Sequence, residues 1–226
     1  MDLFLDTASL DEINEVNRWG VLRGITTNPT LITKEERDFL PLVKEICSIV
    51  DGDVSVETAS DDTDVLIRQG HDIAQIADNA IVKIVMTPNG LAAIRKLSDE
   101  GIKVNVTLVF SPAQAILAAE AGAYIVSPFL GRLDDIAING LEVLAQVCEI
   151  YAAQGYDTKI LAASLRHPIH VVEAALLGAH IATMPFKVFE QLVKHPLTDS
   201  GFEKFLADWK KAAPHLSELP ASYQAD

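Results

Sequence analysis

The sequence of 226 residues is poor in cysteine, in basic charge and in long apolar runs. Its two cysteines, Cys47 and Cys148, lie far apart and form no Cys-x-x-Cys pair, which excludes a disulfide framework and a thiolate zinc site. Lysine and arginine number 18 against 32 aspartates and glutamates. The formal net charge of −14 therefore argues against nucleic acid or an anionic membrane as a partner.

The sequence also lacks a membrane span, a secretory signal and a dinucleotide-binding motif. No apolar run approaches the roughly 20 residues of a membrane span, which predicts a protein without a membrane segment. The start, Met1 to Asp6, lacks the basic region and apolar stretch of a secretory signal, so we expect a cytoplasmic protein. No G-x-G-x-x-G follows the first apolar run, so a dinucleotide-binding fold loses its main support.

The sequence does contain a repeated pattern of short apolar runs, each followed by a longer segment with helical spacing. The runs lie at residues 3–5, 22–25, 54–56, 81–85, 104–109, 124–126, 160–163 and 180–183. Eight such units fit a closed parallel barrel better than an open sheet. We therefore predict an α/β protein with one (β/α)8 TIM barrel domain over residues 1–226.

Several segments carry the signals of helix starts and ends. Ser9 to Glu12 and Thr33 to Glu36 resemble capping boxes, and Thr87-Pro88 and Ser111-Pro112 place a hydroxyl before a proline. An extra C-terminal helix is predicted at about 198–211, where apolar residues at helical spacing need a surface to cover: Phe202, Phe205, Leu206 and Trp209. Residues 214–226 show no hydrophobic periodicity, so we predict a loose tail there.

The side chains that carry chemistry in such a barrel gather at the C-terminal ends of the strands. The polar residues predicted there are Asp6, Thr26, Asn28, Glu57, Lys83, Asn105, Thr107, Ser127, Arg132, Ser164, Arg166 and Thr183. Lys83 is the sharpest candidate, because apolar residues on both sides indicate a strand buried on both faces. Burial disfavours a charged ammonium and makes a neutral amine available to attack a carbonyl. The structural alternative is a lysine that snorkels or pairs with a carboxylate.

Two pairs of residues could support such a lysine. Asp6 and Glu57 follow nearby strands and could relay protons directly or through a held water, although each could instead cap a turn or pair. Arg132 and Arg166 follow the sixth and seventh predicted strands, where barrels often bind phosphate. Two planar guanidinium groups suit a phosphate dianion, so we expect an anion site there.

A metal site is the weaker alternative. His167 and His170 flank Pro168-Ile169, but the sequence offers no obvious third ligand at diagnostic spacing, so we expect no metal. The Asp134-Asp135 pair is more typical of a solvated loop or helix start than of an ion cage.

With these residues, the chain resembles the transaldolases of the short, single-barrel subfamily that also contains the fructose 6-phosphate aldolases. The resemblance covers roughly residues 1–211 and is carried by residues 4–7, 24–29, 81–84, 105–108, 127–132 and 162–166. Many members have proline where this chain has Val85, and Pro88-Asn89-Gly90 is also unusual, but neither departure removes a catalytic group.

The resemblance implies a role for each candidate. Lys83 would form a Schiff base with the donor ketose, Asp6 would transfer protons during carbon–carbon cleavage, and Glu57 and Thr107 would hold the water used in carbinolamine chemistry. The implied substrate-binding residues are Thr26, Asn28, Asn105, Ser127, Phe129, Arg132, Ser164 and Arg166. The family needs no metal and no organic cofactor. Its members assemble into rings, commonly decamers of two pentamers, in which the final helix reaches a neighbouring subunit, so the resemblance implies a homo-oligomer.

The subtype depends on a few positions. Glu57, Phe129 and Asn105 resemble the transferases, whereas the aldolases have glutamine and tyrosine at the first two. We therefore expect transfer of a dihydroxyacetone unit from sedoheptulose 7-phosphate to glyceraldehyde 3-phosphate, giving erythrose 4-phosphate and fructose 6-phosphate. Cleavage of fructose 6-phosphate by an aldolase is the main alternative. Two other classes of function are possible. A non-catalytic phosphosugar-binding barrel would not need a buried Lys83. A metal-dependent hydrolase would lose activity when a chelator removes the metal.

Overall fold

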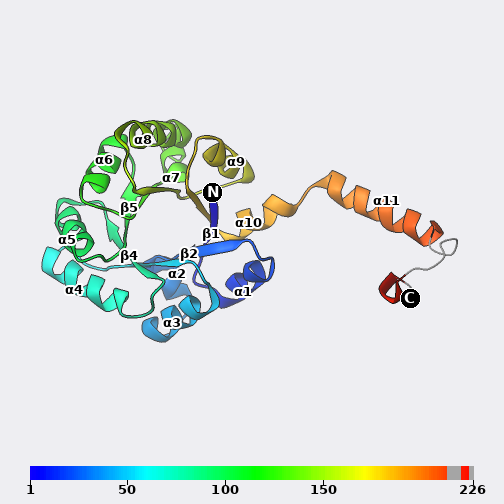
Figure 1. The fold of residues 1–226 in the computed structure, drawn as a ribbon, viewed down its shortest axis with the longest axis horizontal. Coiled ribbons are helices and arrows are strands. Elements are labelled where there is room, and N and C mark those ends of the chain that lie inside the picture. The colour runs from blue at the N-terminus through cyan, green and yellow to red at the C-terminus, as the bar shows by residue number, and fades with distance from the viewer. Residues whose placement is uncertain (213–219, 224–226) are drawn as a thin grey trace. The chain divides into compact units, whose positions relative to one another are not determined.

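Eight parallel strands close into a barrel in the computed structural model, which describes residues 1–212 and 220–223 (Figure 1). Hydrogen-bonded neighbours follow the order of the chain, and the last strand pairs with the first. The strands are β1 (Asp2–Asp6), β2 (Leu22–Thr26), β3 (Asp53–Glu57), β4 (Ala80–Val85), β5 (Val104–Val109), β6 (Ile125–Pro128), β7 (Lys159–Ala162) and β8 (Ile181–Met184). The predicted (β/α)8 TIM barrel is confirmed.

Helices alternate with the strands and form an outer ring around the barrel, as Figure 1 shows for α1, α3, α4, α5, α6, α8 and α9. Two short helices, α2 and α7, lie in the loops that follow β2 and β6. The helices are α1 (Leu10–Arg18), α2 (Pro29–Lys34), α3 (Phe39–Ile49), α4 (Thr63–Ala74), α5 (Pro88–Asp99), α6 (Pro112–Glu120), α7 (Leu130–Asp134), α8 (Gly140–Gln154), α9 (Pro168–Leu176), α10 (Phe186–Val193) and α11 (Pro196–Ala212).

Local sequence signals explain several of these boundaries. The hydroxyls of Thr87 and Ser111 accept backbone hydrogen bonds at the starts of α5 and α6, as the sequence predicts. The capping box predicted at Thr33 is wrong, because Thr33 lies inside α2 and Asn28 caps that helix instead. Ser9 does occupy the N-cap of α1, but its side chain makes no capping hydrogen bond. The difference at Thr33 arises because Pro29 starts α2 earlier than the hydroxyl pattern suggests.

The strand register positions the candidate residues. Glu57 pairs with Lys83 across β3 and β4, and Lys83 pairs with Asn105 across β4 and β5. Asp6 lies opposite Thr26 in the same way on β1 and β2. Residues in register on neighbouring parallel strands stand at one height, so these side chains gather at the C-terminal end of the barrel.

The chain divides into two compact units, of which the first is Met1–Phe189 and the second begins at Glu190. Helix α11 of the second unit confirms the predicted C-terminal helix. The predicted loose tail at 214–226 lies mostly outside the described residues, and Ala221–Tyr223 within it forms a 3-10 turn. Among the described residues, no helix combines the length and apolar character needed to cross a membrane.

Candidate active site

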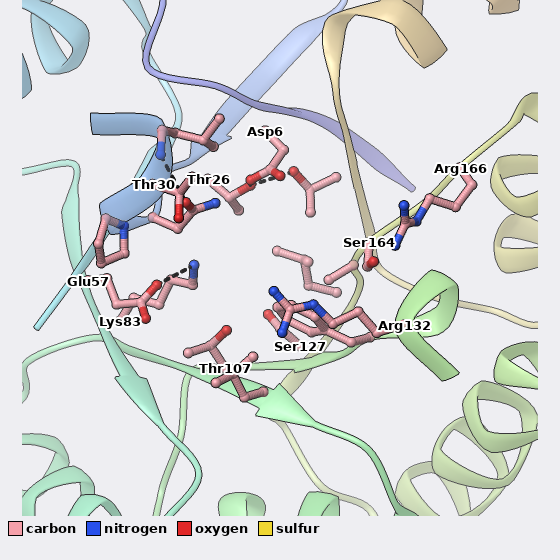
Figure 2. A pocket seen from close by; sticks show the side chains of 18 residues that line it. Asp6, Thr26, Thr30, Glu57, Lys83, Thr107, Ser127, Arg132, Ser164 and Arg166 are labelled. Carbon is pink, nitrogen blue, oxygen red and sulfur yellow. Dashed lines mark hydrogen bonds and ion pairs between the residues drawn. The ribbon is translucent and has the colours of Figure 1, made fainter. Parts of the chain in front are cut away.

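A pocket of about 430 Å³ opens at the C-terminal ends of the strands (Figure 2). Every strand of the barrel contributes to its wall, through Asp6, Thr26, Glu57, Lys83, Thr107, Ser127, Leu161 and Thr183. Loop residues after β2, β6 and β7 complete it: Asn28, Pro29, Thr30, Leu31, Phe129, Arg132, Ala163, Ser164 and Arg166, with Leu108 of β5. A cavity of this volume is in the range that encloses a small ligand.

Lys83 points its amine into this pocket from β4 (Figure 2). The residue is 5% exposed. Its Nζ lies 2.9 Å from Oε2 of Glu57 and donates a hydrogen bond of 2.7 Å to the backbone carbonyl of Thr27. The lysine is therefore both buried, as predicted, and paired with a carboxylate, which the sequence left as the alternative. A buried ion pair of this kind keeps a proton acceptor directly beside the amine.

Asp6 occupies another part of the wall and has a perturbed carboxyl group. Thr26 donates a hydrogen bond of 2.7 Å to Oδ1 of Asp6, and the Thr26 and Thr183 hydroxyls lie 2.6 Å apart. Burial raises the pKa of Asp6 above 3.8, and the charge of Glu57 acts in the same direction, whereas the Thr26 hydrogen bond and the Lys83 charge oppose it. The raised pKa brings the carboxyl closer to the range in which it exchanges protons at neutral pH.

Thr107 has a buried hydroxyl without a hydrogen-bond partner among the described residues. Native proteins seldom bury a polar atom in this way unless water or a ligand completes its bonding. The residue lines the pocket from β5 and precedes Leu108, whose φ of 57° is in the left-handed region. A non-glycine residue there is strained, and strain of this kind concentrates at functional sites.

Asn105 is fully buried and does not line the pocket. Its side-chain amide donates to the Ser55 hydroxyl at 3.0 Å and accepts a hydrogen bond of 2.7 Å from Ser127. The amide thus fixes the hydroxyl of Ser127, which does line the pocket.

Arg132 and Arg166 lie on the side of the pocket formed by the loops after β6 and β7. Arg132 extends its guanidinium group into the pocket, whereas Arg166 stands at the edge (Figure 2). The Arg132 group lies 5.7 Å from the centre of the Phe129 ring, a cation–π contact. Arg166 pairs with Asp135 at 2.8 Å, but both side chains are more than half exposed, so solvent weakens the pair.

Gly131 allows the two arginine-bearing loops to approach closely. Its backbone N–H donates to the carbonyl of Ser164 at 3.0 Å. A Cβ at this position would stand 2.2 Å from the same carbonyl and 2.4 Å from Nε of Arg166. The Arg166 side chain therefore rests on a surface that only glycine provides.

The two candidate histidines make contacts within the protein. His167 caps α9, and His170 places Nε2 3.1 Å from Asp134. Among the residues that the structure describes, no three His, Cys, Asp or Glu side chains are grouped to hold a metal ion.

Comparison with known proteins identifies the family. Residues 3–218 match the model of the family described as Transaldolase/Fructose-6-phosphate aldolase. The chain belongs to this family. A probable transaldolase of Thermoanaerobacter sp. (strain X514) is 57% identical over 212 residues, which cover 94% of this chain and 98% of that protein. A probable transaldolase of Aquifex aeolicus (strain VF5) is 56% identical, covering 93% and 97%.

The fold of this family member also resembles a solved structure of different sequence. Thiamine phosphate pyrophosphorylase from Pyrococcus furiosus aligns with a TM-score of 0.58 and 17% identity, covering 84% of this chain and 93% of that one. At this identity the likeness concerns the barrel alone.

All of the site residues predicted from the sequence line the pocket except Asn105, which accepts a hydrogen bond from Ser127. The prediction that Asn105 contacts substrate stays a prediction. The sequence missed Thr30 and Leu31, which α2 brings to the pocket, and the apolar wall residues Leu108, Leu161 and Ala163. The sequence did not mark Leu108, Leu161 and Ala163 as pocket residues, because apolar side chains at strand ends look like core. Thr30 and Leu31 were missed because α2 itself was not predicted at this position.

Proposed function

We propose that this family member is a transaldolase, which transfers a dihydroxyacetone unit from sedoheptulose 7-phosphate to glyceraldehyde 3-phosphate through a Schiff base on Lys83. The observation that carries the proposal is the buried amine of Lys83, held in the pocket 2.9 Å from Glu57. The names of relatives that are 56–57% identical, all probable transaldolases, support the same activity.

The first steps use Lys83 and Glu57. Passage of one ammonium proton to Glu57 leaves a neutral amine, which attacks the ketose carbonyl and gives a carbinolamine. Proton return from Glu57 to the carbinolamine hydroxyl expels water and leaves the iminium ion. The unpartnered Thr107 hydroxyl is suited to hold this water during its departure and during the later hydrolysis.

Asp6 then acts on the sugar. It accepts the proton of the hydroxyl next to the bond that breaks, the aldehyde product leaves, and the bond electrons pass into the iminium to form a three-carbon enamine on Lys83. An acceptor aldehyde reverses these steps: the enamine carbon attacks the aldehyde, and Asp6 returns its proton to the new alkoxide. The raised pKa of Asp6 suits a carboxyl that both takes and gives a proton.

Arg132 and Arg166 are proposed to bind the substrate phosphate. They are the cations on the same side of the pocket, and Lys83 is occupied by Glu57. Bidentate guanidinium contacts also orient the phosphate end of the sugar in the pocket.

An assay with fructose 6-phosphate tests the proposal and separates it from the aldolase alternative. A transaldolase forms sedoheptulose 7-phosphate when erythrose 4-phosphate is the acceptor and releases little dihydroxyacetone without it. Release of dihydroxyacetone at an equal rate with and without acceptor would assign aldolase activity instead. Absence of both products, with the protein folded, would refute both.

We propose also that the chain is cytoplasmic and forms a ring of identical subunits. The apolar residues of α11 support self-assembly, because Phe202 and Phe205 are 61% and 72% exposed in the single chain. Helix α9 presents a second apolar face through Ile169, Val172 and Leu176. Sedimentation equilibrium should give a mass near ten subunits, and a monomer at micromolar concentration would contradict ring formation.

A further inference from the structure

His170 has no place in the proposed chemistry, yet it lies between the two loops that carry the arginines. The residue is 5% exposed and lies in the first turn of α9. The backbone N–H of Arg166 donates to Nδ1 of His170 at 3.3 Å, and Nε2 of His170 lies 3.1 Å from Oδ2 of Asp134. One imidazole ring thus contacts the loop after β7 on one edge and the end of α7 on the other.

These contacts assign the protonation of the ring. Nδ1 accepts a hydrogen bond, so the single proton of the neutral ring belongs on Nε2, where it is donated to the carboxylate of Asp134. Asp134 in turn accepts a hydrogen bond of 2.9 Å from the backbone N–H of Gly140, at the start of α8. The neutral ring satisfies both neighbours, and no other protonation state does.

The contacts of His170 link the two segments that carry the guanidinium groups. Arg132 lies on α7 two residues before Asp134, and Arg166 is the residue whose backbone the ring holds. A phosphate group bound by both arginines requires a fixed spacing between them, because bidentate hydrogen bonds are short and directional. The exposed pair of Arg166 with Asp135 is too weakly held to fix that spacing by itself.

We propose that His170 is a positioning residue for the phosphate end of the substrate, acting through the backbone of Arg166 and the carboxylate of Asp134. The proposal rests on the proposed function, since it takes phosphate as the group that the two arginines bind. It adds a specificity-determining residue that does not itself contact substrate.

The surroundings of His170 keep the ring neutral in neutral solution. The groups that face it are Asp134 on α7, Arg166 at the loop after β7 and His167 at the N-cap, whose ring centre is 3.9 Å away. Burial, and then the His167 charge, lower the pKa of His170 below its usual 6.5, while Asp134 opposes them. In acid the ring gains a proton on Nδ1 and loses its acceptor for the Arg166 N–H.

Three variants test the proposal, with fructose 6-phosphate and unphosphorylated fructose as paired donors. His170→Phe removes both contacts, and His170→Asn keeps an acceptor at the position of Nδ1. His71→Phe is the matched control, because His71 pairs with Glu100 at 2.6 Å on the helical surface of the barrel. Titration of each protein with inorganic phosphate measures the anion site without turnover.

His170→Phe should raise the KM for fructose 6-phosphate about tenfold, with kcat changed less than about twofold and fructose unaffected. His170→Asn should recover most of this loss, and His71→Phe should behave as wild type. The ratio of kcat/KM between His170→Phe and wild type should approach one as the pH falls through the lowered pKa of His170. This ratio cancels the titration of the substrate phosphate.

Equal losses for the two sugars, or unchanged phosphate affinity in His170→Phe, would overturn the proposal. If His170→Phe does not fold, His170→Asn decides in its place. Asparagine does not titrate, so the ratio of kcat/KM for fructose 6-phosphate between His170→Asn and wild type should rise as the pH falls through the lowered pKa of His170, and a constant ratio would overturn the proposal. Wild-type protein that binds phosphate but turns over neither sugar would refute the transaldolase proposal alone. In that case a weaker phosphate affinity in His170→Phe would still support the positioning role.

Discussion

Replacing Gly131 by alanine tests the close approach that supports the proposed phosphate site. The new Cβ would stand 2.2 Å from the carbonyl of Ser164 and 2.7 Å from Cγ of Arg166. Arg166 is a flexible side chain and can move, but the Ser164 carbonyl is backbone that accepts the hydrogen bond of Gly131. Helix α7 must therefore shift away from the loop after β7.

The cost has two parts. Overpacking of this kind destabilises a fold by about 1–3 kcal/mol, and a weakened backbone hydrogen bond adds about 1 kcal/mol. Displacement of Arg166 removes a charge-assisted contact to phosphate, worth about 1.5–3 kcal/mol, or roughly tenfold to a hundredfold in kcat/KM. The first part lowers the melting temperature, and the second affects phosphorylated substrates only.

The assay compares melting temperature and kcat/KM for fructose 6-phosphate and fructose in Gly131→Ala and in Gly155→Ala. Gly155 has a φ of 68° and no atom within 4 Å of its added Cβ, so alanine there introduces only backbone strain, about 1 kcal/mol. Both variants should melt at lower temperature, but only Gly131→Ala should lose the preference for the phosphorylated sugar. Full retention of that preference, or equal losses for both sugars, would refute the reasoning.

Four further substitutions have defined outcomes. Arg132→Ala and Arg166→Ala should each reduce kcat/KM for fructose 6-phosphate by about tenfold to a hundredfold and leave fructose little changed; equal losses would make the arginines structural. Asp6→Asn should abolish activity yet raise the melting temperature at neutral pH, because the stability linked to the raised pKa of Asp6 is present below 3.8 and is lost as the pH rises through the folded value. Differential scanning calorimetry should show this gain shrink as the pH falls toward 3.8, and a constant gain would contradict the assignment. Phe129→Tyr places a hydroxyl at the pocket wall and should increase release of dihydroxyacetone relative to transfer, measured without and with acceptor; an unchanged ratio would show that the partition is set elsewhere.

Most of the fold could be predicted because the hydrophobic periodicity of each segment agrees with the capping and turn residues at its ends. The run around Lys83 is apolar on both faces of β4, as a barrel strand requires, and Gly155 ends α8 in the left-handed conformation. Helix α2 was not predicted at its observed position, since the capping-box pattern indicates a helix start at Thr33, whereas Asn28-Pro29 starts the helix earlier. Local propensity outweighed periodicity there, because six residues are too few to display a period.

The candidate site could be predicted as a set of residues but not as a set of contacts. Polar side chains at strand ends identify Asp6, Glu57 and Lys83, because barrel topology brings them together wherever they lie in the sequence. The sequence does not show which hydroxyl remains without a hydrogen-bond partner. It also does not show which histidine contacts two loops, because both depend on distances of a few tenths of an ångström. His170 in particular appears in the sequence as a possible metal ligand, and only the folded loops place its two nitrogens against Arg166 and Asp134.

The central claim is that Lys83 forms the covalent intermediate, and chemical trapping measures this directly. Protein incubated with fructose 6-phosphate and sodium borohydride should gain one reduced dihydroxyacetone unit, and peptide mass spectrometry should locate it on Lys83. Lys83→Arg, which keeps the charge beside Glu57, should gain no mass under the same conditions. Substrate-dependent labelling at another lysine, with Lys83 unmodified, would contradict the account.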